Sequence, residues 1–165
     1  MVDMDKLVVL VNSFGSALVS VSGELGVNVN LNKSQVSQGI KVKNVCAAAL
    51  IGIIGGGLQG SALVMFDKDS FETVITTISR EIITPNLDDA MSMSVVEEYL
   101  NMISGRALIH SAIQNIKVTP PQFIAGDNIR IVQNQAKDIR CFTLPFNILD
   151  GGAALYLVLS FHINS

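Results

Sequence analysis

The residues best suited to chemistry lie in one stretch, 88–114, which reads DDAMSMSVVEEYLNMISGRALIHSAIQ. It carries a carboxylate at Glu98 and an amide at Asn101, three residues apart. On a helix, positions i and i+3 are neighbours on one face. A carboxylate accepts hydrogen bonds and pairs with cations, and an amide both donates and accepts. The two side chains therefore form a small polar site if the stretch is helical.

Apolar periodicity predicts a helix over about 88–115, with Asn86 or Asp88 as its N-cap. At about 100° per residue, one face within about 60° is apolar and is expected to be buried. It contains Val96, Leu100, Ile103 and Ala107. The opposite face, again within about 60°, is expected to be exposed. It contains Ser94, Glu98, Asn101 and Gly105.

The exposed face has the composition of a docking surface. Met91, Val95 and Met102 border it, and methionine is common on contact surfaces that must adapt. A mid-helix glycine such as Gly105 costs about 1 kcal/mol relative to alanine, which is justified where another backbone approaches closely. Simpler interpretations stay open: a solvated Glu/Asn pair, a glycine packed under a neighbouring helix, or an apolar dimer interface.

The stretch Ser94 to Ala107, SVVEEYLNMISGRA, resembles the signature helix of the CheC/CheX/FliY phosphatases of bacterial chemotaxis, and most closely that of CheX. The family motif has Asp or Ser, then Glu four residues later, Asn three residues after that, and a proline further on. Ser94, Glu98 and Asn101 match this motif. The segment from Pro120 to Gly126, PPQFIAG, also resembles the family. The chain has one such motif, which is the CheX pattern.

The resemblance implies a phosphatase that removes the aspartyl phosphate from a CheY-type receiver domain, in chemotaxis or related two-component signalling. Asn101 would orient the attacking water, as glutamine does in GTPases. Glu98 would anchor the partner by meeting the receiver's active-site lysine. Ser94, Met91, Val95, Met102 and Gly105 would contact the receiver. The chain would need no cofactor of its own because Mg²⁺ would arrive on the receiver.

Two other functions remain open at this stage. One is a non-catalytic adaptor of the same fold, which binds a receiver but does not hydrolyse its phosphate. The other is a purely structural dimerisation domain. The resemblance also implies a homodimer joined through its sheets.

The rest of the chain predicts an α+β fold, in which long helices pack on one face of an antiparallel sheet, as a single CheX-like phosphatase domain over residues 1–165. Helices are expected at 4–25 and in the segment that follows Asp67, where Asp69 or Ser70 is the expected N-cap and Pro85 ends the helix. Strands are expected within the alternating 27–45 segment and in five further segments. These are Ala47–Ile54 and Ser61–Phe66 around a glycine hairpin, Ile129–Val132, Ile139–Pro145 and Ala153–Ile163, with Gly151 and Gly152 in the last turn.

Composition, motifs and residue spacing argue against three other functions. Eleven basic against 14 acidic residues give a formal charge of −3, so the chain lacks the basic excess of a nucleic-acid binder. The glycines at 55–57 lack the lysine of a phosphate-binding P-loop. No spacing makes a metal site with His110, expected near the core edge, or with His162.

The N-terminus lacks the positive region and unbroken apolar run of a signal peptide, and the longest apolar run is shorter than the roughly 20 residues of a membrane span. Cys46 and Cys141 are far apart in apolar surroundings and are expected to be buried, reduced thiols. We therefore expect a cytoplasmic protein that does not bind a membrane.

Overall fold

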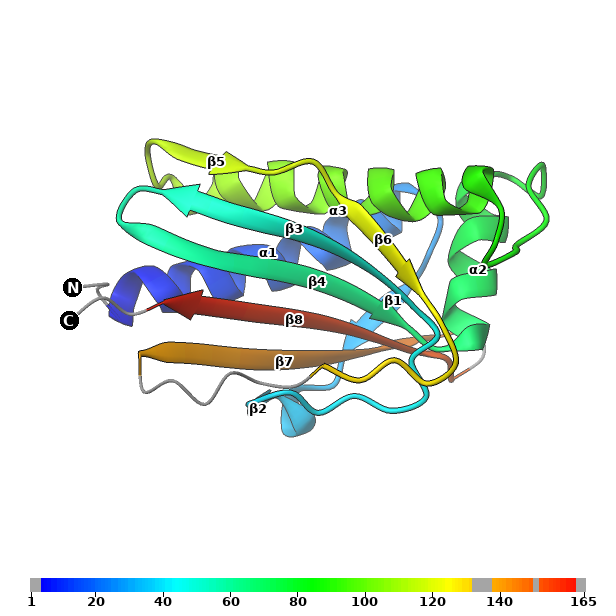
Figure 1. The fold of residues 1–165 in the computed structure, drawn as a ribbon, viewed down its shortest axis with the longest axis horizontal. Coiled ribbons are helices and arrows are strands. Elements are labelled where there is room, and N and C mark those ends of the chain that lie inside the picture. Colours follow the sequence, from blue (N-terminus) through cyan, green and yellow to red (C-terminus); the bar gives the residue numbers. More distant parts are fainter. Residues whose placement is uncertain (1–3, 132–137, 150–151, 163–165) are drawn as a thin grey trace.

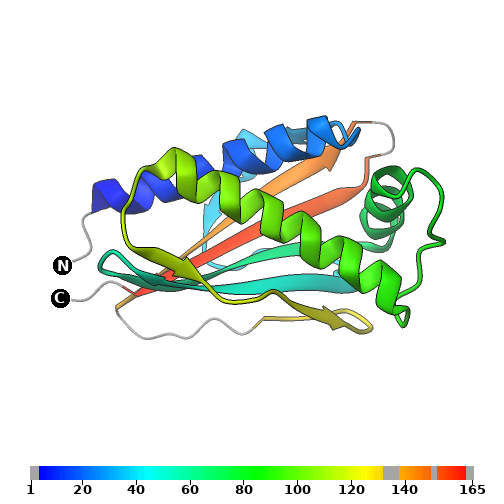
Figure 2. The same ribbon diagram turned by 90° about the horizontal axis from the view of Figure 1, so that it is seen from above.

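A single antiparallel sheet of eight strands forms the centre of the protein, and two long helices, α1 and α3, cover one of its faces (Figures 1 and 2). The structure is a computed structural model and describes residues 4–131, 138–149 and 152–162. The predicted α+β class, with long helices on one face of the sheet, is confirmed.

The strand order is β1-β7-β8-β4-β3-β5, with β2 also paired to β7 and β6 to β3. The sheet therefore has long central strands and short strands at its edges. The central strands are β3 (Ala47–Gly55), β4 (Leu58–Phe66), β7 (Ile139–Ile148) and β8 (Ala154–His162). The edge strands are β1 (Val29–Leu31), β2 (Ser37–Gln38), β5 (Ile116–Val118) and β6 (Gln122–Ala125).

The glycine hairpin between β3 and β4 is confirmed. Gly55 pairs with Leu58, so Gly56 and Gly57 form a two-residue turn with φ values of 60° and 82°. Positive φ at both turn positions matches the twist of the flanking strands and favours glycine. The turn brings β3 back against β4 over its whole length.

Helix α1 (Met4–Glu24) agrees with the expected helix at 4–25, and its apolar stripe is buried. The stripe includes Leu7, Leu10, Phe14, Leu18 and Val21. By length and composition alone α1 could also cross a membrane. A core helix of a soluble protein meets the same criterion, and α1 packs against the sheet and α3 (Figure 2).

Helix α2 (Lys68–Ile78) lies at one end of the sheet (Figure 2). Its N-cap is Asp67, so the expected cap at Asp69 or Ser70 is wrong. One Asp67 oxygen accepts the Ser70 N–H at 2.7 Å, and the other accepts the Ala154 N–H at 3.0 Å. Because the helix starts directly after β4, Asp67 can bond to both α2 and β8. The helix also ends well before Pro85.

Helix α3 (Ala90–Ser111) is shorter than the expected 88–115, and its N-cap is Asp89 rather than Asn86 or Asp88. Asn86 instead accepts the Asp88 N–H at 2.9 Å and stabilises the preceding turn. At the other end Ala112 adopts a left-handed conformation, with φ of 54°, and ends the helix. The residues that follow form β5, which the sequence reading missed.

Two further expectations for strands need correction. Of the 27–45 segment only β1 and β2 are strands. The described part of Ile129–Val132 is not a strand, although the Ile129 N–H donates to the Val45 carbonyl at 2.7 Å. The strand in this region is the edge strand β6, which lies a few residues before the predicted one. Val132, Gly151 and Ile163 lie outside the described residues, and Gly152 has a φ of 69°.

The apolar core is divided by the sheet. The larger part lies between the sheet and the helices. A smaller cluster lies on the opposite face, where residues of 40–45 and 129–131 pack against Ala48, Met65 and Val158. The sheet therefore has an inner face under the helices and an outer face partly covered by these segments.

Candidate functional site

Helix α3 presents one polar strip to solvent and buries the opposite face completely. Val96, Leu100, Ile103 and Ala107 are all 0% exposed. The polar strip consists of four exposed residues: Ser94, Glu98, Asn101 and Gly105. The two faces that helical spacing predicts are thus confirmed, and burial of one face fixes the direction of the other.

Glu98 and Asn101 have unused hydrogen-bonding capacity. Among the described residues, none forms a hydrogen bond or an ion pair with either side chain. An exposed carboxylate and an exposed amide that lie side by side, with no partner among the described residues, are available to a partner molecule.

Tyr99 fixes the helix from inside, between Glu98 and Asn101 in sequence. Its hydroxyl lies 2.5 Å from the Ser22 hydroxyl of α1, and both residues are buried. Its ring lies against Phe66 of β4, with 6.3 Å between the ring centroids. Burial raises the pKa of Tyr99 well above its ordinary value, so the phenol stays neutral. Rotation of α3 about its axis would break this buried contact.

Arg106 fixes the helix from outside. Its guanidinium donates two hydrogen bonds to the Glu24 carboxylate, at 2.8 and 2.7 Å, and one to the Ser20 hydroxyl at 2.6 Å. The hydrogen bond from Arg106 lowers the pKa of Glu24 below its ordinary value. A two-point pair of this kind restricts orientation more than a single contact does. Asn101 is therefore on a helix that is attached to α1 at two points.

Gly105 has open space above it. A Cβ built at this position would meet no atom within 4 Å. The interpretation that Gly105 packs under a neighbouring helix of the same chain is therefore wrong. The space fits the other prediction, close approach by a partner backbone.

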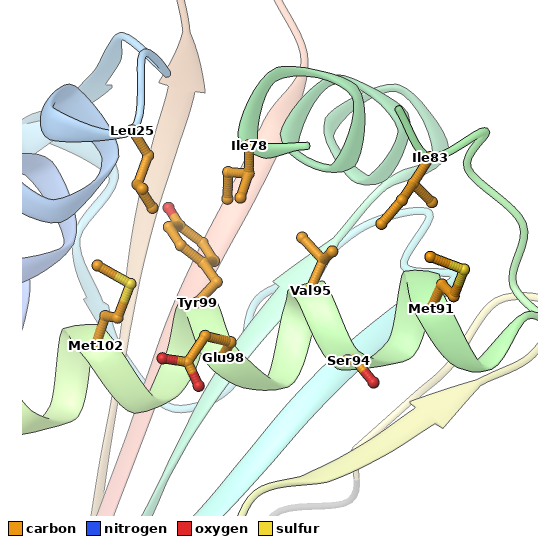
Figure 3. Close-up of a pocket in the computed structure, with 9 residues that line it drawn as sticks. All are labelled: Leu25, Ile78, Ile83, Met91, Ser94, Val95, Glu98, Tyr99 and Met102. Atoms are coloured by element: carbon orange, nitrogen blue, oxygen red, sulfur yellow. The ribbon is translucent and has the colours of Figure 1, made fainter. Parts of the chain in front are cut away.

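An apolar groove runs beside the polar strip, between α3 and the C-terminal ends of α1 and α2 (Figure 3). We call it the α3 groove; its volume is about 310 Å³. It is lined by Leu25, Ile78, Ile83, Met91, Ser94, Val95, Glu98, Tyr99 and Met102. The three apolar residues expected at the margin of the polar strip thus form one wall of a groove.

The sequence reading missed the other wall of the α3 groove. Leu25, Ile78 and Ile83 come from three places in the chain, and Figure 3 shows them opposite the α3 side chains. Leu25 and Ile78 stand at the ends of the apolar stripes of their helices, where a stripe leaves the core. That is the only sequence signal for them.

The remaining candidates are not joined to this site. Within the described ranges no group of three or more His, Cys, Asp or Glu residues could hold a metal ion. His110 is exposed rather than near the core edge, and His162 Nδ1 lies 3.0 Å from Asp138 Oδ2. Cys141 is buried and Cys46 half-buried; both are free thiols whose pKa is raised by burial.

Comparison with known proteins gives a family. The family model for "Chemotaxis phosphatase CheX" matches residues 47–147, which include all of α3. No curated protein sequence matches the chain.

Solved structures with the same fold include chemotaxis proteins. The CheX proteins of Desulfovibrio desulfuricans and Vibrio vulnificus superpose with TM-scores of 0.76 and 0.77, at 21% and 16% sequence identity. Each match covers 93% of this chain and 99% of the other chain. A chain of the CheX–CheY–BeF₃–Mg²⁺ complex of Borrelia burgdorferi has a TM-score of 0.69 at 20% identity. That match covers 92% of this chain and 97% of the other.

Proposed function

Since this chain belongs to the CheX family of chemotaxis phosphatases, we propose that it hydrolyses the aspartyl phosphate of a CheY-type receiver domain. One observation carries the proposal. Glu98 and Asn101 are exposed, and have no side-chain partner in the described part of the chain, on the outward face of a helix whose other face is fully buried. A convex helix with two free polar groups is suited to entering a partner's active site.

Asn101 is proposed to hold the attacking water. Phosphoryl transfer needs a nucleophile in line with the bond that breaks, and catalysis is largely positioning and charge stabilisation. An amide offers both a donor and an acceptor, so it can orient a water molecule without carrying charge towards the phosphoryl group. Because α3 is attached to α1 through Tyr99 and Arg106, the amide is held in place before the receiver arrives.

Glu98 is proposed to anchor the receiver. A carboxylate beside a phosphoryl group is repelled unless it is paired, so it needs a cation on the partner. In the receiver that cation is the active-site lysine. A charge-assisted hydrogen bond between them would fix the position of α3 relative to the phosphate. In this mechanism Glu98 does not act as a general base.

The receiver is proposed to supply the metal. The complex from Borrelia burgdorferi combines CheX, CheY, BeF₃ and Mg²⁺. In this proposal Mg²⁺ belongs to the receiver and neutralises charge on its phosphoryl group. Ser94, Met91, Val95, Met102 and Gly105 are proposed to contact the receiver around the polar pair. We further propose a cytoplasmic homodimer joined through the sheets.

The test is phosphate release from a phosphorylated, Mg²⁺-loaded CheY-type receiver, with this protein in substoichiometric amount. We expect many turnovers with the native protein and a loss of roughly 10²-fold or more in kcat for Asn101→Ala, since the water is no longer held. Binding to the beryllofluoride-loaded receiver should change by less than about threefold. Asn30→Ala, at an exposed asparagine of β1, is the matched control and should have native activity.

Each other outcome contradicts the proposal in a different way. If the native protein binds the receiver but does not speed loss of phosphate, the chain is an adaptor. If it binds no receiver of its own cell, the domain serves another purpose, such as dimerisation. If Asn101→Ala is fully active, the water is held by another residue.

A further inference from the structure

The α3 groove has an apolar interior with a polar rim. Leu25, Ile78 and Ile83 face Val95 and Met102 across it (Figure 3). Covering such a surface removes apolar area from water, which favours an apolar occupant.

Among the described residues that line the groove, none offers a free polar group to its interior. Tyr99 contributes only its ring, because its hydroxyl is bonded to Ser22. The polar side chains that line the groove are Ser94 and Glu98, at its rim. Sites for small polar ligands need several converging polar groups, which this groove lacks.

The groove is continuous with the polar strip. Ser94 and Glu98 line the groove and also belong to the strip that carries Asn101. A partner that reaches Glu98 and Asn101 therefore covers the edge of the groove as well. A second copy of this chain seated in the groove would block the same residues.

The charge of Glu98 further limits which groups can occupy the groove. Of the described residues that line the groove, one is charged, Glu98, and no described residue pairs with it. An occupant that buries this rim must bring a cation to Glu98, because an unpaired buried carboxylate is costly. The occupant therefore combines a cation with an adjacent apolar group.

From these features we infer that the α3 groove receives a large apolar side chain that the receiver domain presents beside the cation that meets Glu98. This inference rests on the proposed function. Met91 and Met102 form the adaptable part of the wall, and their flexible thioethers can adjust to the entering side chain. The groove thus contributes affinity and register, while Asn101 contributes the chemistry.

The double variant Met91→Gln/Met102→Gln tests the groove. Glutamine has nearly the length and helix propensity of methionine, so the change replaces apolar wall by polar wall with little effect on the helix. We expect the Kd for the beryllofluoride-loaded receiver and the KM for the phosphorylated receiver each to rise about tenfold or more. The kcat should stay within about threefold of native, in contrast to Asn101→Ala.

Met93→Gln/Ile109→Gln is the matched control on the same helix. The side chain of Met93 leaves the helix about 200° away from that of Met91, and Ile109 lies about five helical turns after Met91. Neither lines the groove, so this variant should bind and hydrolyse as the native protein does. The single variant Met91→Gln changes a side chain that is 57% exposed, so it keeps the fold and should itself raise Kd.

If the native protein binds the receiver, two results would overturn the inference. One is native Kd and KM in the groove variants. The other is a changed self-association of this chain, measured by sedimentation, with native receiver affinity, which would assign the groove to a second copy. Native protein that binds the receiver without hydrolysing it would contradict the proposed chemistry but leave the groove test readable by Kd. Failure of the native protein to bind any receiver would overturn both.

Discussion

Tyr99 helps to fix the direction of Glu98 and Asn101. It lies between them in sequence, but its side chain is buried and turns towards α1, where its hydroxyl meets that of Ser22. The direction of a helix face is fixed only if the helix cannot rotate, and a satisfied buried polar contact adds to the apolar packing that prevents rotation. The polar strip is therefore positioned from the inside.

Tyr99→Phe should destabilise the protein by about 1–3 kcal/mol, because it leaves the Ser22 hydroxyl buried without its partner. Ser22→Ala should lower the free energy of unfolding by a similar amount, because it leaves the Tyr99 hydroxyl buried without a hydrogen-bond partner. The double variant Tyr99→Phe/Ser22→Ala should cost less than the sum, since neither group is then left unpaired. Urea unfolding of the four proteins measures this coupling, and strict additivity would show that the hydroxyls do not depend on each other.

At the scale of the element, α3 has a feature that serves no purpose within the chain. Gly105 weakens the helix, yet nothing in the described structure needs the space above it. A partner that approaches there would explain the glycine. A substitution can separate its effect on helix stability from its effect on partner binding.

Gly105→Ala should stabilise the free protein by about 0.5–1 kcal/mol, because alanine is the better helix former and its Cβ meets nothing. The same substitution should weaken binding of the beryllofluoride-loaded receiver severalfold, because the Cβ takes up room that the partner needs. Gly23→Ala in α1 is the matched control, since its Cβ would also meet nothing within 4 Å. It should not weaken receiver binding. Unchanged affinity in Gly105→Ala would remove this glycine from the contact surface.

The elements predicted most accurately from the sequence are those with a long, continuous buried face. Helix α1 and the β3–β4 hairpin agree because apolar spacing and the glycine turn are local signals. Caps were misplaced by up to three residues, because several Asp, Asn and Ser residues near each helix start compete for the role. Edge strands β5 and β6 were missed because their pairing with β3 is non-local and their residues are mostly exposed.

The candidate site divides in the same way. Spacing along one helix predicts which residues share the polar strip, and the structure agrees on their exposure. The α3 groove needs three separate elements to meet, which no local pattern encodes. The roles of Glu98 and Asn101 remain predictions that the variants above test.

At the scale of the whole molecule, the two faces of the sheet differ. The inner face is covered by α1 and α3 (Figure 2), whereas the described residues cover the outer face only in part. Leu50 and Ala48 of β3 belong to the apolar cluster on the outer face. Ile54 lies four residues after Leu50 on the same strand, so it points to the same face. Ile124 of β6 pairs with Ala48 and therefore also points outwards. Their side chains are 57% and 42% exposed, which leaves apolar area for a second subunit.

If the chain is a homodimer joined through its sheets, as we propose, sedimentation should give about twice the 17.6 kDa of one chain. Ile54→Lys/Ile124→Lys should then produce a folded monomer. In a two-fold symmetric interface each substitution occurs twice, so four like charges would be brought together. Ile82→Lys/Ile109→Lys is the matched control, because these isoleucines are 82% and 78% exposed outside the sheet, and it should stay dimeric. A monomeric native protein, or a control that dissociates equally, would contradict a dimer through the sheets.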